Sequence, residues 1–139
     1  MKKYDYKVEA YLAYKHAQDF MKSAELLHDN MSTRVVMVNI SFACELYMKA
    51  LLIWNSKSNT IIREHLLAEL FEKLNENIKT RVKTECEIKN WDEFITHSSD
   101  AFRDWRYYYE KDNIMFGHIG GLFAFAESLD KICEEIMPL

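Results

Sequence analysis

Apolar residues recur at helical spacing along most of the chain. Between residues 4 and 27 they fall three or four positions apart on a single stripe, and four of its seven members are alanine: Tyr6, Ala10, Ala13, Ala17, Phe20, Ala24 and Leu27. An apolar stripe with this period is typical of an amphipathic helix. Because alanine is small, the stripe also predicts that a neighbouring helix approaches closely.

The second predicted helix, residues 34–54, is apolar around most of its circumference, which indicates a position in the middle of a bundle. Its few polar side chains, Ser41, Glu45 and Lys49, lie four residues apart and form one narrow line. Glutamate one turn before lysine is the favourable order for an intrahelical ion pair. With so much apolar surface around it, the pair is expected at the edge of the bundle or partly buried, where charges need partners from other helices.

The second half of the chain predicts three more helices. The third carries apolar residues from Leu66 to Ile78, with His65 at its start, and the basic run 79–83 after it reads as a small loop or frayed helix end. The fourth runs from residue 91 to 108 or 109, and the last covers 115–136. Glycines at 117, 120 and 121 are expected to permit close backbone packing or to delay the start of the last helix.

This order of elements predicts an all-α fold, an antiparallel up-and-down four-helix bundle with one additional shorter helix, because short connections make successive helices neighbours. The 139 residues suit one domain, residues 1–139. Three glycines and one proline are too few for the turns of a β-rich fold, and a hydrophobic content of 49% excludes disorder. The net charge of −4 gives no general attraction to a polyanion, so any nucleic-acid contact must be local.

The sequence also bears on location and cofactors. From the sequence we expect no apolar run near the ~18 residues that span a bilayer, and no signal peptide. We therefore expect a cytoplasmic protein without a membrane partner. The three cysteines are expected to be reduced, with Cys44 and Cys133 in the core. Phosphate loops, dinucleotide fingerprints and paired zinc ligands are missing, so no cofactor and no metal is expected.

A second polar constellation occupies residues 103–110. Arg103 and Arg106 share a helix face, and Arg106 lies one turn before Glu110. Arginine beside tyrosine offers planar donors for phosphate and ring faces on which bases stack, and it makes an equally good buried network. If Glu45 meets Arg106 and Lys49 meets Glu110, all four charges are paired. A structural network and a ligand pocket both remain open at this point.

Three stretches together resemble the HEPN family (higher eukaryotes and prokaryotes nucleotide-binding): residues 42–52, residues 65–71 and residues 101–107. With the alanine-rich first helix, the likeness covers roughly residues 5–136. The resemblance implies an all-α bundle that is often dimeric. It also implies an occurrence in toxin–antitoxin or antiphage systems, in RNA-processing enzymes, or as a noncatalytic module that binds nucleotides or partners.

Catalytic members of this family resemble one another in a metal-independent ribonuclease motif, an arginine followed by a polar residue and by histidine four to six positions beyond the arginine. Arg103-Asp104 matches the opening of the motif, but the histidine window holds Tyr108, Tyr109 and Glu110. Tyrosine, with a reference pKa of ~10, is a poor base near neutral pH. His118 is distant, and only folding or dimerisation would bring it to the motif.

The sequence therefore favours a noncatalytic HEPN-like module that binds a nucleotide, RNA or a partner protein. The alternatives are a metal-independent endoribonuclease toxin with a degenerate motif and a structural or adaptor subunit. A homodimer is expected, because the chain has more aromatic residues than one small core needs and interfaces are rich in them: Trp54, Trp91, Trp105, Tyr107 and Tyr108. The alternative is that these residues belong to an ordinary bundle core. The candidate residues of a ligand site or polar network are Glu45, Lys49, His65, Arg103, Asp104, Arg106, Tyr108, Tyr109 and Glu110.

Overall fold

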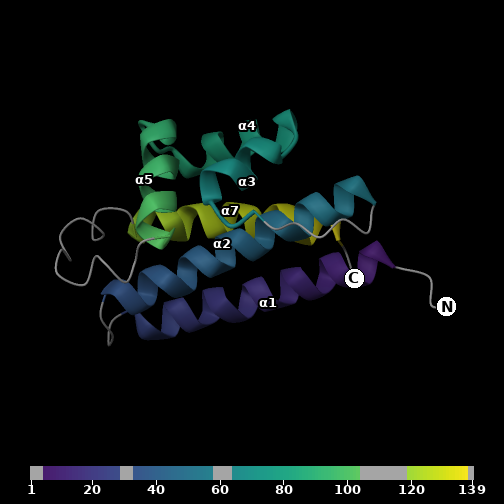
Figure 1. Cartoon of the computed structure of the whole chain (residues 1–139), viewed down its shortest axis with the longest axis horizontal. Coiled ribbons are helices and arrows are strands. Elements are labelled where there is room, and N and C mark those ends of the chain that lie inside the picture. The colour runs from purple at the N-terminus through teal and green to yellow at the C-terminus, as the bar shows by residue number, and fades with distance from the viewer. Residues whose placement is uncertain (1–4, 29–32, 58–63, 104–118, 138–139) are drawn as a thin grey trace.

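The fold is all-helical in a computed structural model that describes residues 5–28, 33–57, 64–103 and 119–137 (Figure 1). At residues 33, 34 and 100–103 only the backbone is described. The described residues form no strand, and their helices are α1 (Tyr6–Leu27), α2 (Thr33–Ser56), α3 (Leu67–Lys73), α4 (Glu76–Cys86), α5 (Trp91–Arg103) and α7 (Ile119–Ile136). The all-α prediction is confirmed.

Helices α1 and α2 form an antiparallel pair. Tyr6, at the start of α1, packs edge-on against Trp54, at the end of α2, with ring centroids 6.0 Å apart. At the other end of the pair, Phe20 lies 5.3 Å from Phe42. The alanines on the stripe of α1 explain the close approach, since Ala10, Ala17 and Ala24 are fully buried against the rest of the core.

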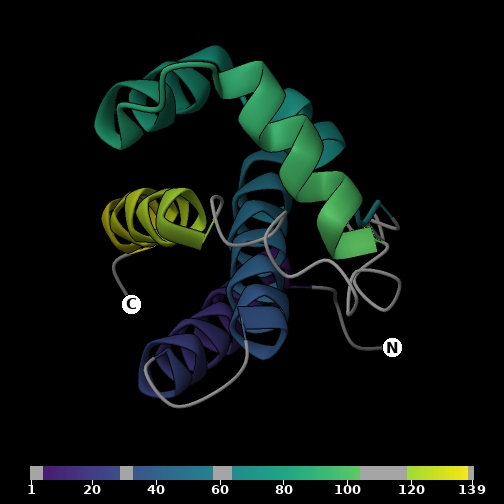
Figure 2. The same cartoon turned by 90° about the vertical axis from the view of Figure 1, so that its left-hand side faces the viewer.

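The remaining contacts complete an up-and-down arrangement. Helix α7 runs in the direction of α2, because the Cys44 thiol lies 3.7 Å from the carbonyl oxygen of Leu122 and the Cys133 thiol lies 3.8 Å from that of Tyr47. Helix α4 packs against α7 in the opposite direction. Helix α5 crosses the long axis of α2 and α7 as the additional helix, and α3, α4 and α5 lie together on one side of α2 with α1 on the other (Figures 1 and 2).

Helix α2 is the central helix, and its composition corrects one expectation. The stretch Val35–Ser56 has a mean hydropathy of 1.6 and is long and apolar enough to cross a membrane by length and composition, so the expectation that no run approaches such a length is wrong. The physical reason is burial, because 67% of the most apolar 18-residue window in that stretch is buried inside the bundle. A central bundle helix has the same composition as a membrane span.

The third predicted helix is two helices, and the basic run 79–83 is helical. Leu74 and Asn75 are extended, with ψ of 153° and 160°, so α3 ends and α4 begins there. The side chain of Asn75 accepts a hydrogen bond from the amide of Ile78, a favourable N-cap. The expectation of a small loop or frayed helix end at residues 79–83 is therefore wrong, since this run lies inside α4, which ends at Cys86 and has Glu87 as its C-cap with φ of 52°.

The basic run is helical because it pairs with acidic side chains on α4 and α7. Arg81 donates to both carboxylate oxygens of Glu135 and to Glu85, three residues that lie on the surface between the two helices. Glu85 also accepts a hydrogen bond from Ser128 at 2.6 Å. That hydrogen bond and Arg81 together hold the pKa of Glu85 below its usual value.

The two helical glycines at the start of α7 predict opposite effects of alanine. A Cβ at Gly121 would lie 2.7 Å from Cε2 of Phe94 on α5, whereas a Cβ at Gly120 would meet nothing within 4 Å. We expect Gly121→Ala to lower the free energy of unfolding by about 1–2 kcal/mol through overpacking. Gly120→Ala should raise it by up to about 1 kcal/mol, because alanine favours helix. Urea unfolding of both variants checks this, and equal effects would contradict close packing at Gly121.

A partly buried polar network joins α1, α2 and α7. Asp130 accepts hydrogen bonds from the Tyr47 hydroxyl at 2.8 Å and from Gln18 at 3.2 Å, and Gln18 also donates to the hydroxyl of Tyr14. Burial and the charge of Asp130 raise the pKa of Tyr14 to about 12. The same two causes raise the pKa of Tyr47 further.

This network predicts a loss of stability at alkaline pH. A tyrosine whose pKa is higher in the folded chain stabilises it fully below the unfolded value of 10.0, and this contribution is lost as pH rises through about 12. We expect the free energy of unfolding to fall over this interval, and to fall less in Tyr14→Phe. Denaturant unfolding at a series of pH values measures both slopes, and equal slopes would contradict the assignment to Tyr14.

Candidate functional site

Three polar side chains meet at one edge of α2. The Lys49 ammonium donates to Oε2 of Glu45 at 3.0 Å, and Nδ1 of His65 lies 3.2 Å from the same oxygen. Lys49 Nζ and His65 Nδ1 are themselves 3.3 Å apart. We call Glu45, Lys49 and His65 the polar triad. The intrahelical pair expected from the sequence is confirmed, and its partner from another part of the chain is the histidine just before α3.

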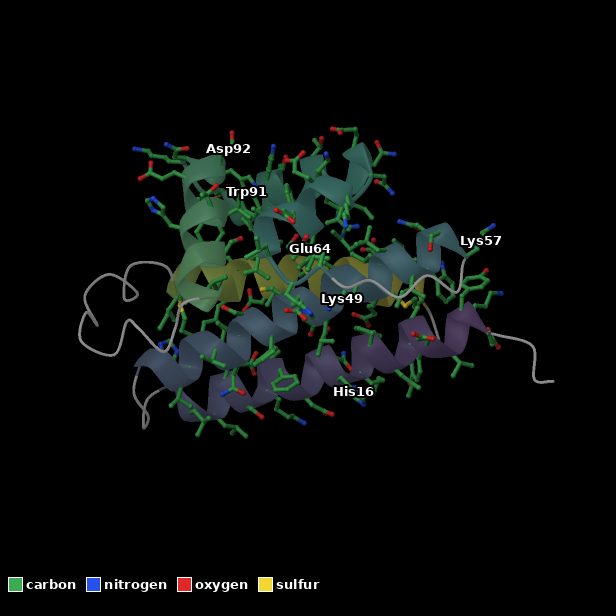
Figure 3. The ribbon with its side chains drawn as sticks, viewed as in Figure 1. His16, Lys49, Lys57, Glu64, Trp91 and Asp92 are labelled. Carbon is green, nitrogen blue, oxygen red and sulfur yellow. The ribbon has the colours of Figure 1, made fainter. Side chains whose placement is uncertain are left out.

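The members of the polar triad differ strongly in exposure. The side chains of Glu45 and Lys49 are 7% and 13% exposed, whereas that of His65 is 70% exposed. Ser41, one turn before Glu45, is fully buried, so the polar line on α2 runs from the core towards the surface. Lys49 lies in the second half of α2, and Glu64 beside the same stretch of that helix (Figure 3). The triad therefore joins a nearly buried ion pair to an imidazole that solvent reaches.

The backbone at His65 is held by hydrogen bonds to the neighbouring Glu64. Oε1 of Glu64 accepts from the amides of His65 and Leu66 at 3.0 and 2.9 Å. A hydrogen bond with Glu69 and these two amides lower the pKa of Glu64, and the first of these contacts raises the pKa of Glu69. Position 65 is thus fixed immediately before α3, as the sequence suggested.

Helix α5 contacts the start of α3, next to His65, through the side chain of Ser99. Leu66, the N-cap of α3, provides no side-chain cap, and the hydroxyl of Ser99 instead accepts a hydrogen bond from the amide of Ala68 at 2.7 Å. Arg103 follows Ser99 by one helical turn and is the last residue of α5. The segment that carries His65 and the helix that carries Arg103 are therefore neighbours.

The other predicted site residues begin with Arg103 at the end of α5 and follow it in the sequence. The backbone of Arg103 is described, but Asp104, Arg106, Tyr108, Tyr109 and Glu110 lie outside the described residues, as does His118. The predicted contacts of Glu45 with Arg106 and of Lys49 with Glu110 fall there too and stay predictions. In the described part of the site, Ser99 was not predicted, because a serine on an amphipathic helix carries no signal of this role.

Two further expectations concern aromatic residues and metal ligands. Trp91 belongs to the core, where its ring lies 4.9 Å from Phe71 and 5.2 Å from Phe125, so it is not available for a dimer face. Trp54 is partly buried against Tyr6. Among the residues that the structure describes, no three histidine, cysteine or acidic side chains gather as a metal site.

The chemistry open to the polar triad follows from its hydrogen-bonding groups. A lysine ammonium only donates and a carboxylate only accepts, whereas each imidazole nitrogen does one or the other according to its protonation. A buried carboxylate on Nδ1 fixes the orientation of the ring, which leaves Nε2 for a ligand or for proton transfer. The triad can therefore offer an N–H donor or a base at the surface, next to a compensated positive charge.

Comparison with known proteins identifies the family. None of the curated proteins and none of the solved structures shows significant similarity to this chain. The family model described as the HEPN domain matches residues 10–137, nearly the whole chain. Its helical bundle agrees with the fold described above. The chain belongs to the HEPN domain family.

Proposed function

We propose that this chain is a noncatalytic HEPN module that binds a phosphate-bearing ligand, a nucleotide or a short stretch of RNA, beside the polar triad. Membership of the HEPN family supports a role related to nucleotides or RNA. The observation that supports this site is the exposed imidazole of His65 held next to the ammonium of Lys49. Both groups are donors to phosphate oxygens when protonated.

The electrostatics of the site favour a local contact over a broad one. Glu45 compensates the charge of Lys49, so the buried pair alone does not attract an anion. Among the described side chains at this edge, His65 can supply the attraction, and we expect Arg103, the last residue of the helix that bears Ser99, and Arg106 to add to it. A guanidinium offers a planar pair of donors to phosphate, which suits this supporting role.

The absence of catalysis is proposed from the sequence of the family motif. Tyr108, Tyr109 and Glu110 occupy the window in which catalytic members carry histidine. A tyrosine does not move a proton readily near neutral pH, and a carboxylate repels a phosphodiester. We therefore expect binding without turnover.

Calorimetric titration with a panel of nucleotides and short RNAs tests this proposal. We expect one member of the panel to bind the wild-type chain, and we expect Arg106→Ala and His65→Gln each to weaken binding about tenfold or more. Lys57→Gln is the matched control, because Lys57 is exposed at the far end of α2 (Figure 3). If no panel member binds, nucleotide and RNA binding are contradicted, and binding of a partner protein is the function that remains for the module.

A second candidate function is the metal-independent ribonuclease, and the contact between His65 and Glu45 is the observation that favours it. An imidazole oriented through Nδ1 by a carboxylate is suited to take a proton through Nε2. In that case His65, and not a residue of the motif window, supplies proton transfer. RNA incubated with the chain in the presence of a chelator distinguishes the two functions. Cleavage that is lost in His65→Gln supports the ribonuclease, and intact RNA contradicts it.

Assembly and biological setting remain proposals. We propose a cytoplasmic homodimer of single-domain chains that acts in a toxin–antitoxin or antiphage system, as the family resemblance implies. With Trp91 in the core, the residues left for the dimer face are Trp54 and the aromatic residues 105, 107 and 108. Sedimentation equilibrium decides between monomer and dimer. A dimer that binds neither nucleotide nor RNA would instead support the structural or adaptor subunit.

A further inference from the structure

One nitrogen of the polar triad, Nδ1 of His65, has two neighbours that require opposite protonation states of it. Nδ1 of His65 lies 3.2 Å from the Glu45 carboxylate and 3.3 Å from the Lys49 ammonium. It must carry a hydrogen to donate to Glu45, and it must be bare to accept from Lys49. The triad therefore has two mutually exclusive hydrogen-bond patterns, and the proton on the ring selects between them.

The protonated ring presents a different surface from the neutral one. With both nitrogens protonated, Nδ1 donates to Glu45, which still accepts from Lys49, and Nε2–H remains as a cationic donor. In the neutral ring with its proton on Nε2, Nδ1 accepts from Lys49 and the positive charge of the ring is gone. Because the ring is 70% exposed and the other two side chains are 7% and 13% exposed, solvent exchanges the proton of the ring while the ion pair stays in place.

Charged groups on α2 contact the ring of His65, and other charged groups lie around the adjoining backbone. Glu45 and Lys49 come from α2, and the Glu64 carboxylate binds the amides of His65 and Leu66. On α3, Glu69 shares a hydrogen bond with Glu64, and Lys73 attracts both of these carboxylates. Among the described side chains of α5, Ser99 contacts this segment, and it is uncharged. Of the two side chains that contact the ring, Glu45 attracts a cationic ring and Lys49 repels it, so a bound anion would add to the attraction.

We propose that His65 takes up a proton when the site binds a phosphate group, so that ligand binding at this edge of α2 is coupled to pH. This regulation rests on the proposed function, because it concerns the same ligand. The bound anion pairs with Nε2–H, Glu45 holds Nδ1–H, and Lys49 keeps its bond to Glu45. Binding then strengthens as pH falls through the titration of the imidazole.

A uridine oligonucleotide is a suitable probe, because its own charge does not change near neutral pH. We expect its affinity, measured by calorimetry, to fall by up to about tenfold for each pH unit above the titration of the imidazole, the limit for one linked proton. Titrations in two buffers with different heats of ionisation should report the uptake of up to one proton per chain. The ring resonances of His65 in nuclear magnetic resonance spectra should titrate at higher pH with the oligonucleotide present.

His65→Gln keeps a polar side chain without the titratable ring and should remove both the proton uptake and the pH dependence. His16→Gln is the matched control, because His16 is exposed on α1 away from the triad (Figure 3), and it should leave both unchanged. Both histidines are exposed, so both variants should unfold thermally as the wild-type chain does.

The outcomes separate this proposal from the proposed function. Binding with equal affinity at about pH 6 and about pH 8, without proton uptake, would overturn the coupling and leave the binding function intact. Proton uptake that persists in His65→Gln would overturn the assignment to His65. Failure to bind the oligonucleotide at either pH would overturn the coupling together with RNA as the ligand.

Discussion

Phe125→Ala should lower the free energy of unfolding by about 3–5 kcal/mol, the largest loss expected from a single substitution in this chain. Phe125 is fully buried on α7, and its ring packs edge-on against Phe71 on α3 and Trp91 at the start of α5. Truncation removes the apolar area and leaves a cavity where three helices meet. Urea unfolding followed by circular dichroism measures the loss.

Phe123→Ala is the matched control, because Phe123 lies on the same helix but is only partly buried and stacks on His28 at 5.2 Å. We expect it to cost less than half as much. Phe125→Leu should lose about 1–2 kcal/mol and remain measurable if the alanine variant does not fold. Equal losses in the free energy of unfolding for Phe123→Ala and Phe125→Ala would contradict a larger contribution of the packing between α3, α5 and α7.

Glu45→Ala should have the second-largest effect, a loss of about 3 kcal/mol in the free energy of unfolding. The variant leaves Lys49, which is 13% exposed, without the carboxylate that compensates its charge. Glu72→Ala is the control, since the Glu72 side chain is 74% exposed and lies 3.7 Å from Lys79; its loss should stay below about 1 kcal/mol. The same unfolding assay compares the two variants.

The double variant Glu45→Met with Lys49→Met tests whether the uncompensated charge of Lys49 destabilises the single variant. Replacing both members of a nearly buried ion pair by apolar residues is often neutral, whereas removing one leaves an uncompensated charge. We therefore expect the double variant to be more stable than Glu45→Ala and less able to bind the oligonucleotide. If the double variant is less stable than Glu45→Ala, the pair contributes stability that burial of apolar area does not replace.

The periodicity of apolar residues predicted most of the architecture, because burial repeats with the helical period. The alanine stripe of α1, the central position of α2 and the burial of Cys44 and Cys133 followed from it. The break at Asn75 did not, since the apolar spacing from Leu66 to Ile78 continues through it. A capping asparagine and the two extended residues at 74 and 75 override that periodicity.

The candidate site was predictable where it lies within one helix and less so where it joins distant parts of the chain. The spacing of Glu45 and Lys49 predicts their contact, because residues one turn apart share a face. The approach of His65 depends on how the chain enters α3, and no periodicity reports this. The network around Asp130 also joins distant parts of the chain and was not predicted. Its member Tyr47 fits the apolar pattern of α2, so its hydroxyl gives no separate signal.

The hydrogen bond from the amide of Ala68 to Ser99 makes the first turn of α3 dependent on a different helix. Leu66 offers no cap of its own, so the amide of Ala68 would be left to solvent if α5 moved away. Local unfolding of α5 would therefore loosen the backbone next to His65 without melting the α1–α2 pair. Amide hydrogen exchange at Ala68 thus reports how firmly α5 is docked, and a ligand that contacts both segments should slow that exchange.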